Sequence, residues 1–404
     1  MMRPFARTGS AVLSLLLVTF LAPHVAAAQK ITVSGQVRPR SELRDPSGAA
    51  GGSQSYTSLR TRIGALYQAQ GPVRAFVQFQ DVRFFGEELG TLSDFDADNQ
   101  DLHQGWLEVG TENSTLALRV GRQEANYGEE RLVGAVDWTQ QGRAFDGARL
   151  RVNADERLTV DVLGFQLAES AAPTQFEDAS FWGAYGVYQA GAGRTLDAYA
   201  LWRYNASDGG DTDQWTSGLR YAASDGGFNY RVEGAWQTGE RVGSDVSAWL
   251  LAAQVGRDFH QGRAGVTLWL DYLSGNDPGS DEVGVFETLF ATNHKFYGFA
   301  DLFTDIPLHT AGRGLVDMAV KGRWQVHPDW RLNLDLHRFT VAEDDGLADD
   351  HLGTEVDLTL TRSLFYGLRV SGGASYVFEG DALLPVRGIG EDVQFVYVML
   401  DLVF

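Results

Sequence analysis

The sequence predicts an all-β fold: a transmembrane antiparallel up-and-down β-barrel of about 18 strands, with short periplasmic turns and long external loops. Runs in which apolar and polar residues alternate recur along the chain, at about the 9–11 residues that a tilted strand needs to cross a bilayer. The connections between these runs are alternately short and long. The chain ends on such a run, 395–404, whose last residue, Phe404, is an aromatic of the kind favoured at membrane interfaces.

Residues 1–28 are predicted to form a signal peptide. Arg3 and Arg7 give a short positive region, the apolar stretch 11–21 follows, and three alanines at 26–28 form a cleavage site. A helical membrane anchor is the alternative, but it would need roughly 20 apolar residues. We therefore expect residues 29–404 to be exported and to form a single outer-membrane barrel domain.

The composition restricts the classes of function. The chain has no cysteine, which excludes a disulfide scaffold and any thiolate metal site. Its formal net charge of −20 argues against nucleic-acid partners. Of the 33 basic residues only Lys30, Lys295 and Lys321 are lysines. Arginine therefore predominates, and its planar guanidinium grips carboxylates in a way that the ammonium group of lysine does not.

The alternating runs give an even number of strands, as single-chain bacterial barrels have. We predict strands at 31–42, 56–69, 73–82, 102–110, 115–122, 144–152, 157–167, 180–189, 194–204, 215–223, 228–238, 245–258, 263–273, 313–326, 330–341, 352–361, 365–378 and 393–404.

Every second connection between these strands is short and rich in Gly, Asn, Asp or Pro, the residues of tight turns. The others are longer, notably 83–101, 123–143 and 274–312. This pattern places both termini in the periplasm. A soluble β-helix or a β-sandwich would also contain many strands, but neither predicts the alternation. The segment 296–303 has the pattern of an extra strand, and we assign it to the longest loop because counting it would break the parity.

One face of each strand is polar and is expected to line the lumen. In the first strand Ile31 and Val33 oppose Arg38 and Arg40. An arginine that faced lipid near the middle of the bilayer would cost about 2–4 kcal/mol. A one-residue error in register would reverse all such assignments together. The predicted pore-lining residues are Arg38, Arg40, Arg60, Arg62, Arg74, Arg119, Arg149, Arg151, Arg231, Arg323, Arg369, Asp81, Glu108 and Asp161.

Rings of arginine select anions in pores, so these residues predict passage of anionic solutes along an arginine ladder. The alternative is that the arginines only pair with luminal carboxylates and stiffen the wall. Because basic residues dominate the first seven strands and acidic residues the last few, we favour the channel role for the cluster as a whole. The 123–143 loop is expected to fold inward as a constriction, with Arg122, Tyr127, Glu130 and Arg131 as its residues.

Acidic clusters fall in predicted external loops at 94–98, 208–213, 276–282 and 343–350. The simpler interpretation is solvation of exposed loops. The second is bridging by Ca²⁺ to anionic surface lipids, since clustered carboxylates suit that ion. No other cofactor and no metal site are expected.

Several stretches resemble the alginate-export porin family of the outer membrane: 118–134, Trp138, 143–151, 274–277, 286–290, 294–298, 301–303 and 351–360. The resemblance covers the chain from about Ile31 to Phe404. It implies an 18-stranded barrel with an arginine-lined pore that passes a polyuronate. The well-known members have a long periplasmic loop that helps to occlude the pore, whereas every periplasmic turn predicted here is short.

The predicted function is therefore passive passage of anionic solutes through the outer membrane, with export of an alginate-type polysaccharide as the specific form. The expected partners are outer-membrane lipids, an anionic polysaccharide or oligosaccharide, and the barrel-assembly machinery. A general porin without a preferred solute is the alternative. A barrel enzyme would need a histidine beside a nucleophile at the rim, and His294, His309 and His351 lack such spacing.

Overall fold

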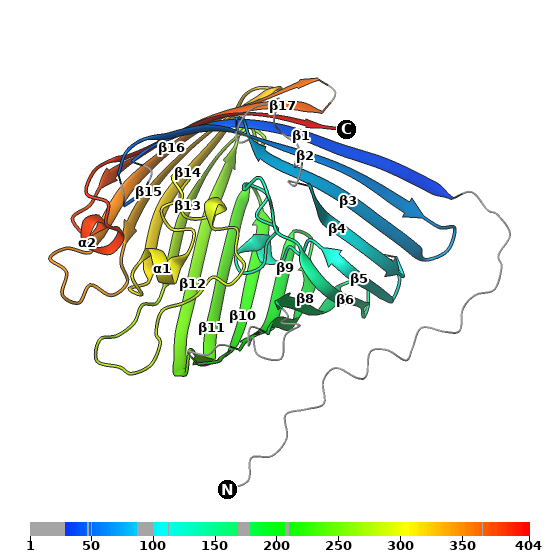
Figure 1. Cartoon of the computed structure of the whole chain (residues 1–404), viewed down its shortest axis with the longest axis horizontal. Helices are drawn as coiled ribbons and strands as arrows, with labels where there is room; N and C mark the ends of the chain where they lie inside the picture. The colour runs from blue at the N-terminus through cyan, green and yellow to red at the C-terminus, as the bar shows by residue number, and fades with distance from the viewer. Residues whose placement is uncertain are drawn as a thin grey trace, which may run out of the picture.

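The computed structural model describes residues 29–46, 48–49, 51–86, 100–111, 113–168, 178–206, 210–365 and 367–404. They form one sheet of 18 strands in which every pair of neighbours is antiparallel (Figure 1), and β1 pairs with β18 to close it into a barrel. The predicted fold class is confirmed. The predicted signal peptide, residues 1–28, lies outside the described residues.

The strands agree with the predicted ones in number and order. They are β1 (Lys30–Asp45), β2 (Gln54–Gln68), β3 (Val73–Phe84), β4 (Gln100–Val109), β5 (Leu116–Gln123), β6 (Phe145–Asn153), β7 (Leu158–Ala168), β8 (Ala179–Gly191), β9 (Arg194–Asn205), β10 (Thr212–Asp225), β11 (Phe228–Arg241), β12 (Ser244–Phe259), β13 (Ala264–Leu273), β14 (Leu315–His327), β15 (Trp330–Thr340), β16 (His351–Phe365), β17 (Leu368–Glu379) and β18 (Val393–Val403). The short helices are η1 (Gly128–Glu130), η2 (Asn293–Lys295), α1 (Ile306–His309) and α2 (Leu383–Arg387).

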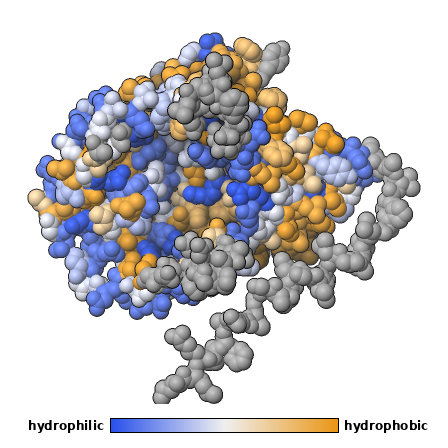
Figure 2. Space-filling view, viewed as in Figure 1, coloured by the Kyte–Doolittle hydropathy of each residue, from blue (hydrophilic) through white to orange (hydrophobic). Residues whose placement is uncertain are grey.

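Side chains alternate between the two faces of the barrel wall. In β5 the side chains of Leu116, Leu118 and Val120 are exposed on the outside, whereas Ala117 between them is buried on the inside. Apolar side chains cover much of the outer surface, while polar ones gather around the hollow interior (Figure 2). An outward apolar band is the surface that a barrel presents to lipid. Among the described residues, no helix has the length and hydropathy required to span a bilayer.

We call the end of the barrel with the connections 69–72 and 192–193 the turn end, and the opposite end, with the 124–144 and 274–314 loops, the loop end. The predicted alternation of short turns and longer loops has one exception. β11 and β12 are joined at the loop end by two residues only, Val242 and Gly243, with φ of 53° and 76°. Positive φ at both central residues is the geometry of the tight hairpin turns that match strand twist.

Two long segments from the loop end fold into the barrel. Residues 124–144 and 286–303, together called the luminal plug, meet through backbone hydrogen bonds although they are far apart in sequence. Val133 and Phe290 form a parallel bridge, and the amide of Gly134 donates to the carbonyl of Phe290 at 2.9 Å. The aromatic rings of Phe296 and Phe303 are buried in this interior. The segment 296–303 belongs to the loop, as predicted.

The packing of α1 at the loop end predicts a pH effect. The imidazole Nδ1 of His309 accepts a hydrogen bond from the amide of Asp305 at 3.2 Å, which requires the neutral ring. Burial and repulsion by Arg387 of α2 lower the pKa of His309 below its ordinary 6.5. The lowered pKa means that its contribution to stability is present above pH 6.5 and is lost as the pH falls through the folded value. An NMR titration of Arg387→Gln should give a higher pKa for His309 than the wild type. An unchanged pKa would contradict the assigned repulsion.

Candidate functional site: the plugged lumen

Inward-facing arginines of β1 and β2 hold the luminal plug against the barrel wall. Arg38 donates to two carbonyl oxygens of residues 137–139 at 2.7 and 2.9 Å. Arg40 donates to the carbonyl oxygen of Trp138 at 2.5 Å, and its guanidinium lies 4.1 Å from the centre of the same indole ring. Arg60 reaches two carbonyls of this segment at 3.3 and 3.4 Å. The backbone of the plug therefore satisfies arginines that would otherwise be buried without acceptors.

The carboxylate of Asp137 adds a charge to this contact. Its Oδ1 lies 2.7 Å from the guanidinium of Arg60 and 3.7 Å from that of Arg62, and its Oδ2 lies 3.4 Å from Arg38. Arg62 also approaches Glu124 at 3.6 Å and donates to Gln80 at 2.7 Å. One carboxylate at the surface of the plug is thus shared by three arginines of the wall.

A second basic group lies nearer the turn end, on the inner face of β3–β6. Glu108 is buried, and one of its oxygens accepts from Arg74 while the other accepts from Arg119 at 2.7–2.8 Å. Arg149 approaches that second oxygen at 3.7 Å, and its Nε is buried without a hydrogen-bond partner among the described residues. The indole of Trp106 stacks against Arg119 at 3.9 Å. Three guanidinium groups around one carboxylate leave a net positive charge, and we call these residues the Glu108 cluster.

The 124–144 loop crosses from this basic side to the opposite wall. Tyr127 donates to Asp161, which also accepts from Arg151 at 2.8 Å. Further along the loop, Arg131 donates to Asp271 of β13 at 2.5 Å and lies 3.4 Å from Glu233 of β11. The loop therefore presents carboxylate and carbonyl oxygens to the basic wall. To the opposite wall it presents both the guanidinium of Arg131 and the carboxylate of Glu129, which pairs with Arg220 and Arg231.

The 286–303 part of the plug is attached to the acidic wall and to the loop end. The amide of Ala300 donates to Glu355 of β16 at 2.7 Å. The side-chain amide of Gln237 exchanges two hydrogen bonds with the backbone of Glu287. The carboxylate of Glu287 in turn lies between Arg203 and Arg241. These contacts hold the segment on strands β9, β11 and β16.

A stack of rings joins the two halves of the plug. Trp138 and His294 lie parallel with 3.9 Å between their centres, and Phe299 follows at 4.9 Å from His294. Asp301 accepts from the indole of Trp138 at 3.3 Å and lies 2.7 Å from the Nδ1 of His294. With Arg40 on the other face of Trp138, the stack runs from the β1 wall into the 286–303 segment.

A cavity of about 630 Å³ remains in the lumen between the plug and the wall. Its lining carries charges of both signs and several aromatic rings. Basic groups come from Arg231, Lys295 and Lys321, and acidic groups include Asp137 and Asp335. Because the cavity combines charged and aromatic side chains inside the barrel, it is the candidate site for a solute.

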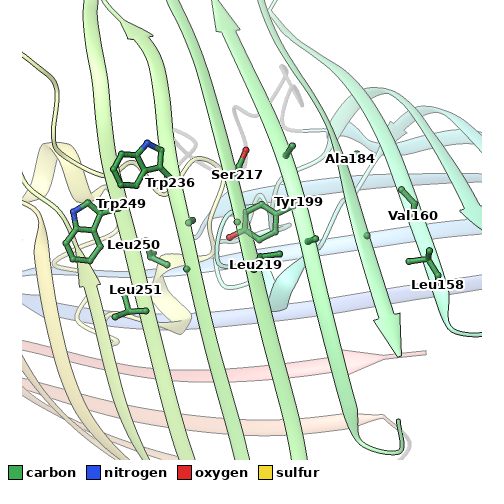
Figure 3. A pocket seen from close by; sticks show the side chains of 16 residues that line it. Leu158, Val160, Ala184, Tyr199, Ser217, Leu219, Trp236, Trp249, Leu250 and Leu251 are labelled. Atoms are coloured by element: carbon green, nitrogen blue, oxygen red, sulfur yellow. The ribbon is translucent and has the colours of Figure 1, made fainter. Parts of the chain in front are cut away.

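A larger depression of the surface, about 1080 Å³, lies elsewhere and is almost wholly apolar. Figure 3 shows Trp236 and Trp249 at one side of it and Leu158 and Val160 at the other, with Leu219 of β10 between them. These side chains belong to the outward face, where Trp236 and Trp249 are exposed. The depression faces away from the lumen, so it is not part of a path through the barrel.

The strand register places most of the predicted pore-lining residues on the inner face. Arg231 is paired there with Glu129 of the plug, and Arg323 and Arg369 lie near the turn end, 2.6 Å from Asp258 and 3.0 Å from Asp401. The inner-face set is Arg38, Arg40, Arg60, Arg62, Arg74, Arg119, Arg149, Arg151, Arg231, Arg323, Arg369, Glu108 and Asp161. Contact with a solute stays a prediction for each of them.

Two predicted site residues lie on the outer face instead. Asp81 pairs in register with Thr61, which lies between the inward-facing Arg60 and Arg62 and so points outward, and Asp81 binds Arg83 at 2.6 Å. Arg122, predicted in the constriction loop, is part of β5. It alternates with the inward-facing Gln123 and binds the outward Asp146 at 2.7 Å. Neither side chain can reach the lumen. Tyr127, Glu130 and Arg131 do lie in the plug, where Glu130 accepts from Thr292 at 2.6 Å.

The acceptors that the plug supplies to the basic wall were not predicted. Asp137, Trp138 and Gln140 meet β1 and β2, but nothing in their local sequence distinguishes them from ordinary loop residues. Arg44 was detectable, because it continues the alternation of Arg38 and Arg40 beyond the predicted end of the strand. It donates to the carbonyl of Ala300 in the plug.

Of the four predicted acidic loop segments, only some lie within the described residues. Residues 94–98 and 207–209 lie outside the described residues, whereas 276–282 and 343–350 lie at the loop end. Within the described ranges, no three His, Asp or Glu side chains are arranged to hold a metal ion. Bridging by Ca²⁺ stays a prediction.

Solved structures with the same fold cover nearly the whole chain. OpdO of Pseudomonas aeruginosa has a TM-score of 0.65 and 15% identity over 93% of this chain and 97% of its own. OccAB4 of Acinetobacter baumannii has a TM-score of 0.64 and 10% identity over 93% and 98%. OccK2 (OpdF) of P. aeruginosa, solved in complex with glucuronate, has a TM-score of 0.61 and 15% identity over 95% and 99%.

At such identities these likenesses concern the fold alone. A comparison with curated proteins gives no match. The family model described as "Alginate export" matches residues 29–389, which is most of the chain and agrees with the resemblance seen in its motifs. The chain therefore belongs to the alginate export family of outer-membrane β-barrel channels.

Proposed function

We propose that this barrel is a passive outer-membrane channel for carboxylate-bearing saccharides of the uronate class. The observation that carries the proposal is the one-sided distribution of charge on the inner face. Arginines occupy the inside of β1–β6, with a net positive charge at the Glu108 cluster, although the whole chain has a net charge of −20. Arginine-lined pores select anions, and the guanidinium fork matches a carboxylate.

The likeness to a channel whose structure holds glucuronate supports the same class of solute. A uronate would enter between the plug and the wall and move between arginines that already share their acceptors. Shared contacts of this kind are individually weak, and several weak sites in series allow a solute to leave as readily as it enters. Glu108 has a moderating role in this scheme, because it competes with the solute for three guanidinium groups.

A general porin without a saccharide preference is the second candidate. The cavity beside the plug favours it, since that lining carries both signs of charge and is not uniformly basic. The two candidates differ in how strongly uptake depends on the carboxylate of a sugar.

Solute influx into liposomes distinguishes these candidates. The refolded protein should admit glucuronate faster than glucose, which has nearly the same size and no charge. Equal rates for the two sugars would favour the general porin. Faster glucose entry would contradict passage of anions.

The Glu108 cluster should contribute to this preference. Arg149→Ser combined with Arg119→Ser removes two positive charges from the inner face, so the ratio of glucuronate to glucose influx should fall. The matched control is Arg194→Ser at the turn end, an exposed arginine that pairs with Asp225 at 3.6 Å outside the lumen. If the double variant kept the wild-type ratio, the cluster would have no part in selection.

Glu108 itself should have opposite effects on selectivity and stability. Glu108→Gln leaves Arg74, Arg119 and Arg149 without their shared anion, so the ratio of glucuronate to glucose influx should rise. Removing one partner of a buried ion pair costs about 3–5 kcal/mol. Urea unfolding of the barrel in lipid vesicles measures that loss. A variant as stable as the wild type would mean that burial of the three arginines does not require the charge of Glu108.

The plug should decide whether a polymer can pass. Val133 and Phe290 form a backbone bridge, so cysteines at these positions are near enough for a disulfide, and the chain has no other cysteine. The oxidised double variant should admit glucuronate at the wild-type rate, because the residual cavity stays open, but should exclude long oligouronates until a reductant is added. Passage of the oligomers with the disulfide intact would place the plug outside their path.

A further inference from the structure

The contact between Asp137 and the barrel wall is built like an occupied anion-binding site. Arg38 and Arg60 are directly opposite each other in the register of β1 and β2, and Arg62 is next to Arg60 on the same face. Like charges placed opposite each other on neighbouring strands repel. An anion shared between them removes this repulsion, and the carboxylate of Asp137 lies in that position, 2.7 Å from Arg60, 3.4 Å from Arg38 and 3.7 Å from Arg62.

The two sides of this contact differ in their exposure to solvent. The side chains of Arg60 and Arg38 are 0% and 3% exposed, whereas that of Asp137 is 68% exposed. Asp137 lines the luminal cavity of about 630 Å³. A solute in the cavity therefore meets Asp137 first, and the arginines lie behind it.

The grip on the plug does not depend on the carboxylate. Arg38 and Arg40 hold the backbone carbonyls of residues 137–139 at 2.5–2.9 Å. Rotation of the Asp137 side chain would expose the three arginines to the cavity while these backbone contacts stay in place.

We propose that Asp137 is a tethered competitor: it occupies a carboxylate-binding site made by Arg38, Arg60 and Arg62, and a uronate in the lumen displaces it. The inference rests on the proposed function, because it takes carboxylate solutes to be present in the lumen. The exchange replaces one carboxylate by another and leaves the charge at the arginines unchanged. The tether gives Asp137 a high effective concentration, which keeps the site weak and allows the solute to leave.

Single-channel recording in planar bilayers tests this inference with glucuronate as the probe. Asp137→Asn removes the competing charge and keeps the shape of the side chain. The concentration of glucuronate that blocks half of the current should fall by about tenfold, a change of about 1.4 kcal/mol in binding free energy. The matched control is Asp146→Asn, which removes an outward charge at the loop end that pairs with Arg122. It should leave the half-blocking concentration unchanged.

Two further variants identify the site. Asp137→Ser should act in the same direction as Asp137→Asn. Adding Arg60→Ser to Asp137→Asn should remove the gain in glucuronate affinity, because Arg60 is part of the site that Asp137 occupies and the effects of the two substitutions are then not additive. A gain that persisted without Arg60 would place the effect elsewhere and overturn the inference.

The remaining outcomes are also decisive. An unchanged half-blocking concentration in both Asp137 variants, with the anion preference of the current intact, would overturn the tethered competitor and leave the proposed function standing. A wild-type current without anion preference would overturn the proposed function itself. Failure of both variants to refold would overturn the inference, since a displaceable carboxylate cannot be essential to the barrel.

Discussion

Strand alternation directs many arginine side chains to the inside of this closed barrel, where their guanidinium groups need hydrogen-bond acceptors. The rest of the structure depends on how those acceptors are supplied. Arginine is always charged, and a buried charge without a partner is costly. Here the acceptors are of two kinds: the carboxylates of neighbouring strands, as at Glu108, and the backbone carbonyls of residues 137–139. The second kind holds a loop in the lumen and turns an open barrel into a plugged one.

The plug supplies counter-charges to both of the walls that it touches. Asp137 meets the arginines of β1 and β2, while Arg131 meets Asp271 and Glu233 on the far wall. The backbone bridge between Val133 and Phe290 joins the two segments into one body. Under the proposed function, a solute that carries a carboxylate competes with Asp137 at the arginines of β1 and β2 and with Glu108 at those of β3–β6.

The amino-acid sequence was sufficient for the barrel and only partly for the lumen. All strands were located, because alternation along a strand is a local property. The two-residue turn at Val242 and Gly243 was missed because the predicted eleventh strand ended three residues too early, at 238, and the predicted twelfth began one residue too late, at 245. Asp81 was assigned to the lumen against the alternation of its own strand. Arg122, the last residue of the predicted strand 115–122, was counted with the constriction loop although its side chain points outward from β5.

The inward fold of the 124–144 loop was predicted, but its contacts with Arg38 and Arg40 were not. Those arginines bind backbone carbonyls, which every residue has, so no side-chain pattern in the loop indicates them. The same holds for the approach of Asp137, which depends on where a long loop lies in three dimensions. Arg44, in contrast, could have been found by continuing the alternation of β1.

The central claim is that the lumen prefers anions although the whole chain is acidic. The most direct test is the reversal potential of the wild-type channel in a planar bilayer that separates two concentrations of potassium chloride. A lumen that prefers anions should give a reversal potential with the sign expected for a channel that conducts chloride better than potassium. A potential of the opposite sign would mean that the acceptors of the plug and of the far wall outweigh the arginines, and it would contradict the account.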